Sequence, residues 1–174
     1  LDSDDVLSIL RDAGATTDAK LARSWQWQIS LWKNQGLSSG HALSAQDERA
    51  ISALLVSYAC AIDRRDWEKL RACFSDDCEC DYGSFGKWTG PAALVQYMKQ
   101  VHADVGPTLH RITNIETEMQ NGQAHARSYV DALLMPINEG GPVYHGIGYY
   151  NDQLIRTGAG WRIARRQFVP VFLG

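Results

Sequence analysis

The stretch Asp47–Phe74, DERAISALLVSYACAIDRRDWEKLRACF, decides the fold of this chain. It predicts a long helix, a short break and a second short helix, because its apolar residues recur at helical spacing: Ile51, Leu54, Leu55, Tyr58 and Ile62. Asp63 follows at the edge of this apolar stripe, near the helix end, where the helix dipole disfavours a carboxylate. Asp63 therefore needs a partner. Arg64 or Arg65 would make a structural ion pair, whereas a histidine would make a catalytic pair.

The residues before this stretch predict a helical extension joined to the main domain by a polar linker. Ser44 is placed to cap the long helix, and Asp66 to cap the short helix WEKLRACF, which ends at residues 75–77. Upstream, residues 36–44 read GLSSGHALS, a glycine-containing linker. Residues 1–40 predict two further helices that carry three tryptophans. We therefore expect an N-terminal helical extension at 1–40 and one domain at 41–174.

The residues after the stretch change from helical to strand periodicity. Residues 78–90 predict a short hairpin, and Gly90-Pro91 opens a helix over residues 91–105. Four strands then follow at about 108–119, 123–135, 143–155 and 161–172, with Asn121-Gly122 as a strong hairpin turn. Helices followed by hairpin-linked strands predict a segregated α+β fold with a mostly antiparallel sheet.

Composition excludes several classes of function. The chain has 174 residues, a net charge of −3 and a pI near 5.9, which gives no electrostatic basis for binding nucleic acid or an anionic membrane. The N-terminus lacks the plan of a signal peptide, so we expect a cytoplasmic location. No glycine-rich phosphate loop or metal-ligand spacing occurs, so we expect no cofactor and no metal. The four cysteines are expected to be free, buried or half-buried thiols: Cys60, Cys73, Cys78 and Cys80.

Strand alternation supplies a partner for Asp63. His110, Ile112 and Asn114 share one face of the strand at 108–119. The next strand presents a face of small and apolar residues, which leaves room for a cavity under the helices: Ala124, Ala126, Ser128, Val130, Ala132 and Leu134. An Asp63–His110 pair would fix the imidazole tautomer and stabilise the imidazolium of a general base. Tyr58 would add a hydroxyl donor. The alternative is that His110 is an ordinary hydrogen-bonded core residue.

From about residue 45 onward the chain resembles the SnoaL-like branch of the NTF2-like superfamily. The resemblance rests on a series of segments: ALLVSYACAIDRRDWEKLRACFSDDC, the Tyr-Gly and Trp-Thr-Gly-Pro pairings, LHRITN, the Asn-Gly turn and GWRIARRQF. It implies a cone-shaped α+β barrel, in which a curved sheet wraps around helices and encloses a pocket. It also implies frequent dimerisation through the sheet, so we expect a homo-oligomer, a dimer or a trimer.

Within that branch the chain is similar to the scytalone dehydratase and hexachlorocyclohexane dehydrochlorinase group. This similarity implies that Asp63 and His110 are catalytic, with Tyr58 as a pocket donor and Arg166 as a pocket arginine. Tyr82, Trp88 and Asn114 are expected to contact the substrate. The expected activity is that of a cofactor-independent lyase or isomerase on a small, largely apolar or polyketide-like molecule. The alternatives are a polyketide cyclase, a non-catalytic binding module and a β subunit of a ring-hydroxylating oxygenase.

Overall fold

The computed structural model describes residues 43–174. The extension predicted at 1–40, with its two helices, lies outside the described residues. The described elements follow in the order α3 (Ala45–Asp63), α4 (Trp67–Arg71), β1 (Phe74–Asp81), η1 (Gly83–Phe85), β2 (Lys87–Thr89), α5 (Pro91–Val101), β3 (Thr108–Gln120), β4 (Gln123–Leu134), β5 (Tyr144–Thr157) and β6 (Gly160–Leu173).

Local capping explains where the helices begin. The Ser44 hydroxyl accepts from the Asp47 amide at 3.1 Å, and Asp66 Oδ1 accepts from the Lys69 amide at 3.0 Å. Both caps satisfy amides that lack a partner in the first helical turn. The short helix predicted through Phe74 ends earlier, at Arg71, and Phe74 begins β1. Pairing with β6 and burial of the Phe74 ring outweigh the helical pattern at this point.

The six strands form one open, curved sheet in the order β2-β1-β6-β5-β4-β3. All neighbouring pairs are antiparallel except β1 and β6, which run parallel. The predicted turn at Asn121-Gly122 joins β3 to β4, and both residues have positive φ, 52° and 78°. Strands β2 and β3 are therefore the edges of the sheet within the described residues.

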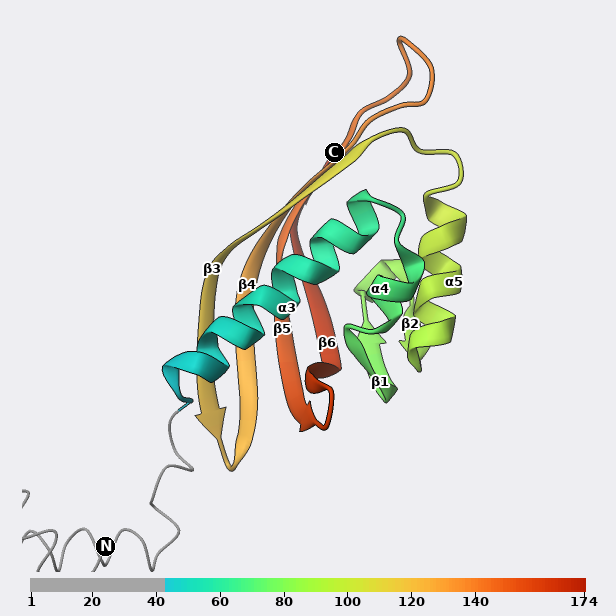
Figure 1. The fold of residues 1–174 in the computed structure, drawn as a ribbon. Coiled ribbons are helices and arrows are strands. Elements are labelled where there is room, and N and C mark those ends of the chain that lie inside the picture. Colours follow the sequence, from blue (N-terminus) through green and yellow to red (C-terminus); the bar gives the residue numbers. More distant parts are fainter. Residues whose placement is uncertain (1–42) are drawn as a thin grey trace, which may run out of the picture. The chain divides into compact units, whose positions relative to one another are not determined.

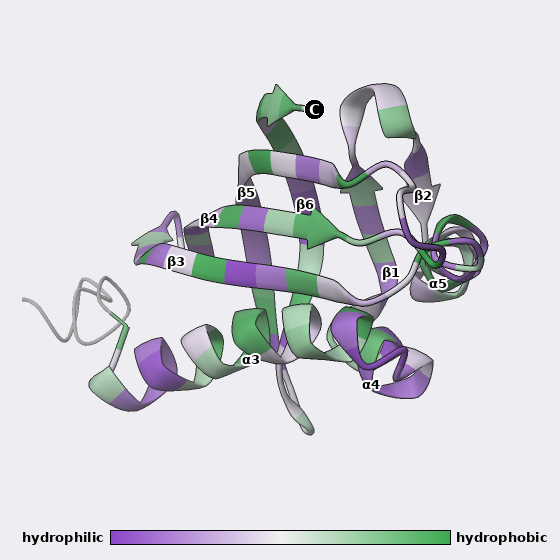
Figure 2. Cartoon of the chain, turned by 90° about the horizontal axis from the view of Figure 1, so that it is seen from above, coloured by the Kyte–Doolittle hydropathy of each residue, from purple (hydrophilic) through white to green (hydrophobic). Residues whose placement is uncertain are grey.

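Helix α3 covers one face of this sheet and supplies much of the core (Figure 1). The small-residue face of β4 lies under it as predicted, with Ala124, Ala126, Ser128, Val130 and Ala132 all buried. Figure 2 shows α3 and α4 together on that side of the strands. The opposite side of the sheet carries polar and aromatic residues that alternate with the buried ones. The small side chains of β4 therefore leave room for a site between α3 and the strands.

Three of the four cysteines are buried, Cys60 is half-buried, and all four are free. Residues 43–174 contain no cluster of three or more histidine, cysteine or acidic side chains suited to a metal ion. Within the same residues, every helix is too short or too polar to span a bilayer.

Candidate active site

An apolar chamber of about 250 Å³ opens between α3, α5 and the covered face of the sheet. Aliphatic and aromatic side chains make up most of its wall, and no lysine, arginine or carboxylate lines it. Its polar groups are the His110 imidazole and tyrosine hydroxyls, including those of Tyr58, Tyr82 and Tyr150. A wall with few polar groups in a mostly apolar surface is typical of a small-molecule site.

A larger hollow of about 490 Å³ lies over the other face of the sheet. Charged and amide side chains of β1, β5 and β6 surround it, among them Glu79, Asn151 and Arg165. Glu79 and Arg165 pair with each other at 3.1 Å and are both well exposed. Each carboxylate in its lining is paired with a lysine or an arginine, Asp152 with the buried Arg166, so the smaller chamber is the better candidate for chemistry.

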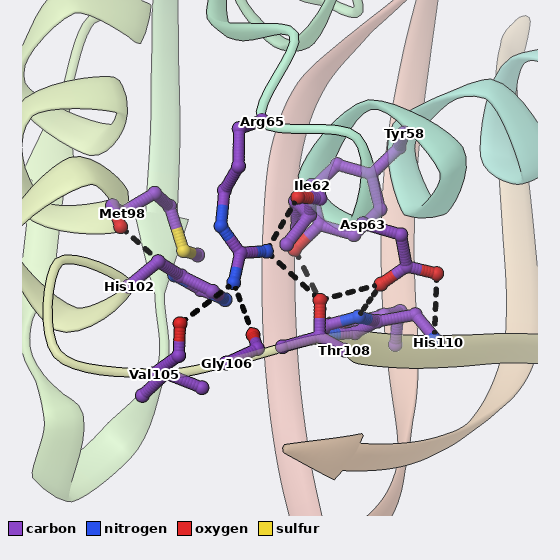
Figure 3. Close-up of polar contacts among 11 residues, drawn as sticks. Tyr58, Ile62, Asp63, Arg65, Met98, His102, Val105, Gly106, Thr108 and His110 are labelled. Carbon is purple, nitrogen blue, oxygen red and sulfur yellow. Dashed lines mark hydrogen bonds and ion pairs between the residues drawn. The ribbon is translucent and has the colours of Figure 1, made fainter. Parts of the chain in front are cut away.

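His110 and Asp63 are hydrogen-bonded at the wall of the chamber (Figure 3). His110 Nδ1 lies 2.7 Å from Asp63 Oδ1, and the His110 amide donates to Asp63 Oδ2 at 2.9 Å. The side chains are mostly buried, with 10% and 20% exposed. An ionised carboxylate only accepts, so Nδ1 carries a proton, and in the neutral form of the ring Nε2 carries the lone pair. Nε2 has no hydrogen-bond partner among residues 43–174.

The chain brings this pair together through the ends of two elements. Asp63 is the last residue of α3, and Thr108 is the first residue of β3. His110 follows Thr108 by two residues, so both side chains point toward the helix. The Thr108 hydroxyl donates to Asp63 Oδ1 at 2.9 Å. Asp63 thus receives three hydrogen bonds from one strand.

These contacts determine the ionisation of Asp63. Burial raises the pKa of this carboxyl, but the bonds from His110 and Thr108 outweigh it, and the pKa lies below its ordinary value of 3.8. The folded state therefore holds Asp63 as a carboxylate at neutral pH.

Replacing Asp63 by asparagine is expected to reduce stability in a pH-dependent way. Because the pKa of Asp63 is depressed in the folded state, its carboxylate stabilises the fold above the unfolded pKa, and this contribution is lost as pH falls through the folded pKa. The difference in unfolding free energy between the two proteins should shrink as pH falls from about 5 to about 2. Urea unfolding at stepwise pH measures it. A difference that does not change with pH would contradict this account of Asp63.

A cluster of three buried tyrosines forms a second polar group in the chamber wall. The Tyr58 hydroxyl lies 2.9 Å from that of Tyr82 and 3.4 Å from that of Tyr150. Burial raises the pKa of all three phenols well above the ordinary value, so they remain protonated. Three hydroxyls contribute three hydrogens, and their two mutual contacts use two of them. These two contacts leave one phenolic O–H uncommitted within the cluster.

Arg166 is placed behind this cluster and not in the chamber wall. Its Nε and Nη2 each donate to an Asp152 carboxylate oxygen at 2.7 Å, and both side chains are fully buried. The guanidinium carbon lies 4.1 Å from the Tyr58 ring centroid and 4.0 Å from that of Tyr150. Burial lowers the pKa of Arg166, but the Asp152 charge outweighs it and raises the pKa. Arg166 is thus a permanent cation that makes cation–π contacts with the rings of Tyr58 and Tyr150.

Two further residues that were expected to contact the substrate do not line the chamber. Trp88 stacks on Tyr97 with ring centroids 4.2 Å apart, and it meets the edge of Tyr82. Asn114 is exposed and has φ +48°, at the irregular register between Thr113 and Glu116. This backbone irregularity breaks the alternation that predicted a shared face with His110. Of the seven residues predicted for the site, Tyr58, Tyr82 and His110 line the chamber, and Asp63 supports it through His110.

Sequence reasoning missed three residues of this region. Tyr150 and Thr108 were given no role, and Arg65 was considered only as a structural ion-pair partner of Asp63. Thr108 carried a usable signal, because it precedes His110 by two residues in a strand and so shares its face.

Several solved structures share the fold of this chain. A protein of Novosphingobium aromaticivorans, provisionally described as a scytalone dehydratase, is 26% identical, with a TM-score of 0.67 over 72% of this chain and 85% of that one. A second protein of that organism, provisionally described as an aromatic ring hydroxylase, is 25% identical, with a TM-score of 0.69 over 76% and 94%. A hexachlorocyclohexane dehydrochlorinase of Novosphingobium barchaimii is 19% identical, with a TM-score of 0.65 over 72% and 87%.

The sequence itself matches the SnoaL-like domain family over residues 44–167, which includes every element from α3 to most of β6. This match and the shared architecture confirm the predicted family. The chain belongs to the SnoaL-like domain family of the NTF2-like superfamily.

Proposed function

We propose that this protein is a cofactor-independent lyase or isomerase that removes a proton from a carbon atom of a small, uncharged, largely apolar molecule. The observation that supports it most is the Asp63–His110 hydrogen bond of 2.7 Å at the wall of an apolar chamber. A histidine whose Nδ1 is held by a carboxylate has Nε2 available as a general base.

The roles of the residues follow from their chemistry. His110 Nε2 accepts the proton, and the Asp63 carboxylate stabilises the imidazolium that forms. Negative charge then develops on the oxygen or other electronegative atom of the substrate. The free O–H of the tyrosine cluster around Tyr58 donates to that atom. Because the wall is mostly apolar, these interactions act with little competition from water.

The chamber restricts the class of substrate. Its volume of about 250 Å³ admits a small molecule. No side chain in its wall carries a fixed charge that would compensate a charged group on the substrate. Aromatic side chains such as Phe85 and Phe168 favour a ring. An uncharged ring compound with an acidic C–H bond beside a carbonyl or a leaving group fits these properties.

The experiment begins with the purified protein and a mixed library of uncharged ring ketones, hydroxyketones and halides, with native mass spectrometry as the readout. Each captured compound is then incubated with the protein in deuterium oxide. Incorporation of deuterium at carbon, or conversion to product, supports the proposal. Compounds that bind and are released with no exchange and no product would establish a binding module in place of an enzyme.

The mass of the product assigns the reaction. Elimination releases water or a hydrogen halide and lowers the mass, whereas isomerisation leaves it unchanged. A polyketide cyclase would begin with the same proton removal at His110 and close a ring, so a product of equal mass with a new carbon–carbon bond assigns that alternative. We also propose a homo-oligomer of two or three copies, which light scattering after size-exclusion chromatography measures.

A further inference from the structure

A continuous chain of hydrogen bonds leads from Arg65 to His110 (Figure 3). Arg65 Nη1 donates to Thr108 Oγ1 at 2.9 Å. Thr108 Oγ1 donates to Asp63 Oδ1 at 2.9 Å, and the same carboxylate oxygen lies 2.7 Å from His110 Nδ1. Arg65 thus stands two hydrogen bonds away from the carboxylate that holds the proposed base.

The direction of these bonds is fixed by chemistry. A guanidinium has donors and no acceptor, so Thr108 must accept from Arg65. A hydroxyl has one hydrogen, which Thr108 then gives to Asp63. We propose that Arg65 and Thr108 are positioning residues for His110. Arg65 polarises the Thr108 hydroxyl toward Asp63, and the bond from this hydroxyl keeps the Asp63 carboxylate ionised and aligned on His110. The effect of this network on catalysis rests on the proposed function, because it acts through His110 as the base. The hydrogen-bond network itself can be tested without a substrate.

Arg65 also holds the backbone on both sides of the pair. It lies in the break between α3 and α4 with φ +58°, a conformation that residues other than glycine adopt rarely. From there its guanidinium donates to the carbonyl of Ile62 at 2.9 Å and to that of Gly106 at 2.8 Å. Ile62 belongs to the last turn of α3, and Gly106 precedes β3. One side chain therefore ties the helix end that carries Asp63 to the strand that carries His110.

Among the described residues, the other ionisable groups near Asp63 do not replace the positive charge of Arg65. His110 faces it from β3, and Arg65 from the end of α3. His102, which follows α5, is buried, and its Nδ1 lies 2.8 Å from the Met98 carbonyl oxygen. Burial lowers the pKa of His102, so this ring is neutral at neutral pH. Among the described residues, Arg65 is then the permanent cation connected to Asp63 by hydrogen bonds.

The experiment compares Thr108→Val with Thr108→Ser, because valine keeps the shape of the side chain and removes its hydroxyl, whereas serine keeps the hydroxyl. The pKa of Asp63 is measured by NMR from its carboxyl carbon, and the His110 ring nitrogens report the tautomer. We expect valine to raise the pKa of Asp63 by about one unit, a roughly tenfold change in its ionisation constant. Serine should leave it close to that of the unsubstituted protein. Equal pKa values in all three proteins would overturn the inference.

A second variant tests the part played by Arg65, and its effect by itself can be measured even if Thr108→Val does not fold. Arg65→Asn tolerates the positive φ and removes the guanidinium. We expect it to raise the pKa of Asp63 when Thr108 is present. In the Thr108→Val background it should add little, because the bond that transmits its effect is gone. Effects that add in full would show direct action of the Arg65 charge and overturn the relay through Thr108.

The outcome separates this inference from the proposed function. If His110→Ala keeps full turnover while Thr108→Val shifts the pKa of Asp63, the proposed function fails and the network stands. If His110→Ala abolishes turnover and Thr108→Val changes neither the pKa nor the tautomer, the function stands and the network fails.

Discussion

Replacing His110 by alanine is expected to lower turnover by about 10²–10⁴-fold and to leave the fold intact. The imidazole is the general base of the proposed reaction, and no other side chain in the chamber wall can take its place at neutral pH. The tyrosines remain protonated because burial raises their pKa. Steady-state kinetics on a compound found in the library screen measure the loss, and circular dichroism checks the fold.

His145 provides a matched control for this prediction. Its Nε2 lies 2.7 Å from Asp131 Oδ1, so it is also a histidine paired with an aspartate. It pairs with Leu133 in the register of β4 and β5, and it lies on the face of the sheet away from α3. His145→Ala should therefore leave turnover unchanged. Retained turnover in His110→Ala, or equal losses in both variants, would contradict the assignment of His110 as the base.

Replacing Asp152 by asparagine is expected to destabilise the fold by about 3–5 kcal/mol. The substitution keeps the shape of the side chain and removes the charge that compensates Arg166. The guanidinium would then be a buried, uncompensated cation, which is among the costliest defects in a protein interior. Its Nη1 already lacks a hydrogen-bond partner among the described residues. Urea unfolding followed by tryptophan fluorescence measures the change.

The neighbouring residue on the same strand gives the control. Arg165 pairs with Glu79 at 3.1 Å on the opposite side of the sheet, with side chains 60% and 58% exposed. Glu79→Gln is expected to cost at most about 1 kcal/mol, because water screens an exposed pair. If Asp152→Asn lowers the free energy of unfolding no more than Glu79→Gln does, the buried Asp152–Arg166 pair does not stabilise the core as described.

The sequence predicted the parts of this structure that depend on local pattern. Ser44 and Asp66 mark helix starts through their own side chains, and Asn121-Gly122 marks a hairpin through its backbone preference. Strand alternation placed His110 on the covered face, because the strand is regular between Thr108 and Thr113. The pairing of Asp63 with His110 came from their unusual positions together with the family resemblance.

The remaining features depend on distances that no local pattern encodes. Asn114 departs from the alternation because of its positive φ, which the residue type permits but does not require. Arg166 was expected in the pocket, yet its charge is neutralised by Asp152 on the adjacent strand, and this register cannot be read from either strand alone. Arg65 reaches Thr108, 43 residues later in the chain, and a side-chain contact of that separation leaves no periodic trace.

The position of His110 on β3 has a consequence for self-association. Strand β3 is an edge of the open sheet in the part of the chain that the structure describes, and exposed edges invite another strand to add. The His110 amide donates to Asp63 Oδ2, so it is not free to pair with an incoming chain. The carboxylate that holds the His110 imidazole thus also blocks this point of the edge. Loss of Asp63 would expose a template for aggregation as well as disturb the site.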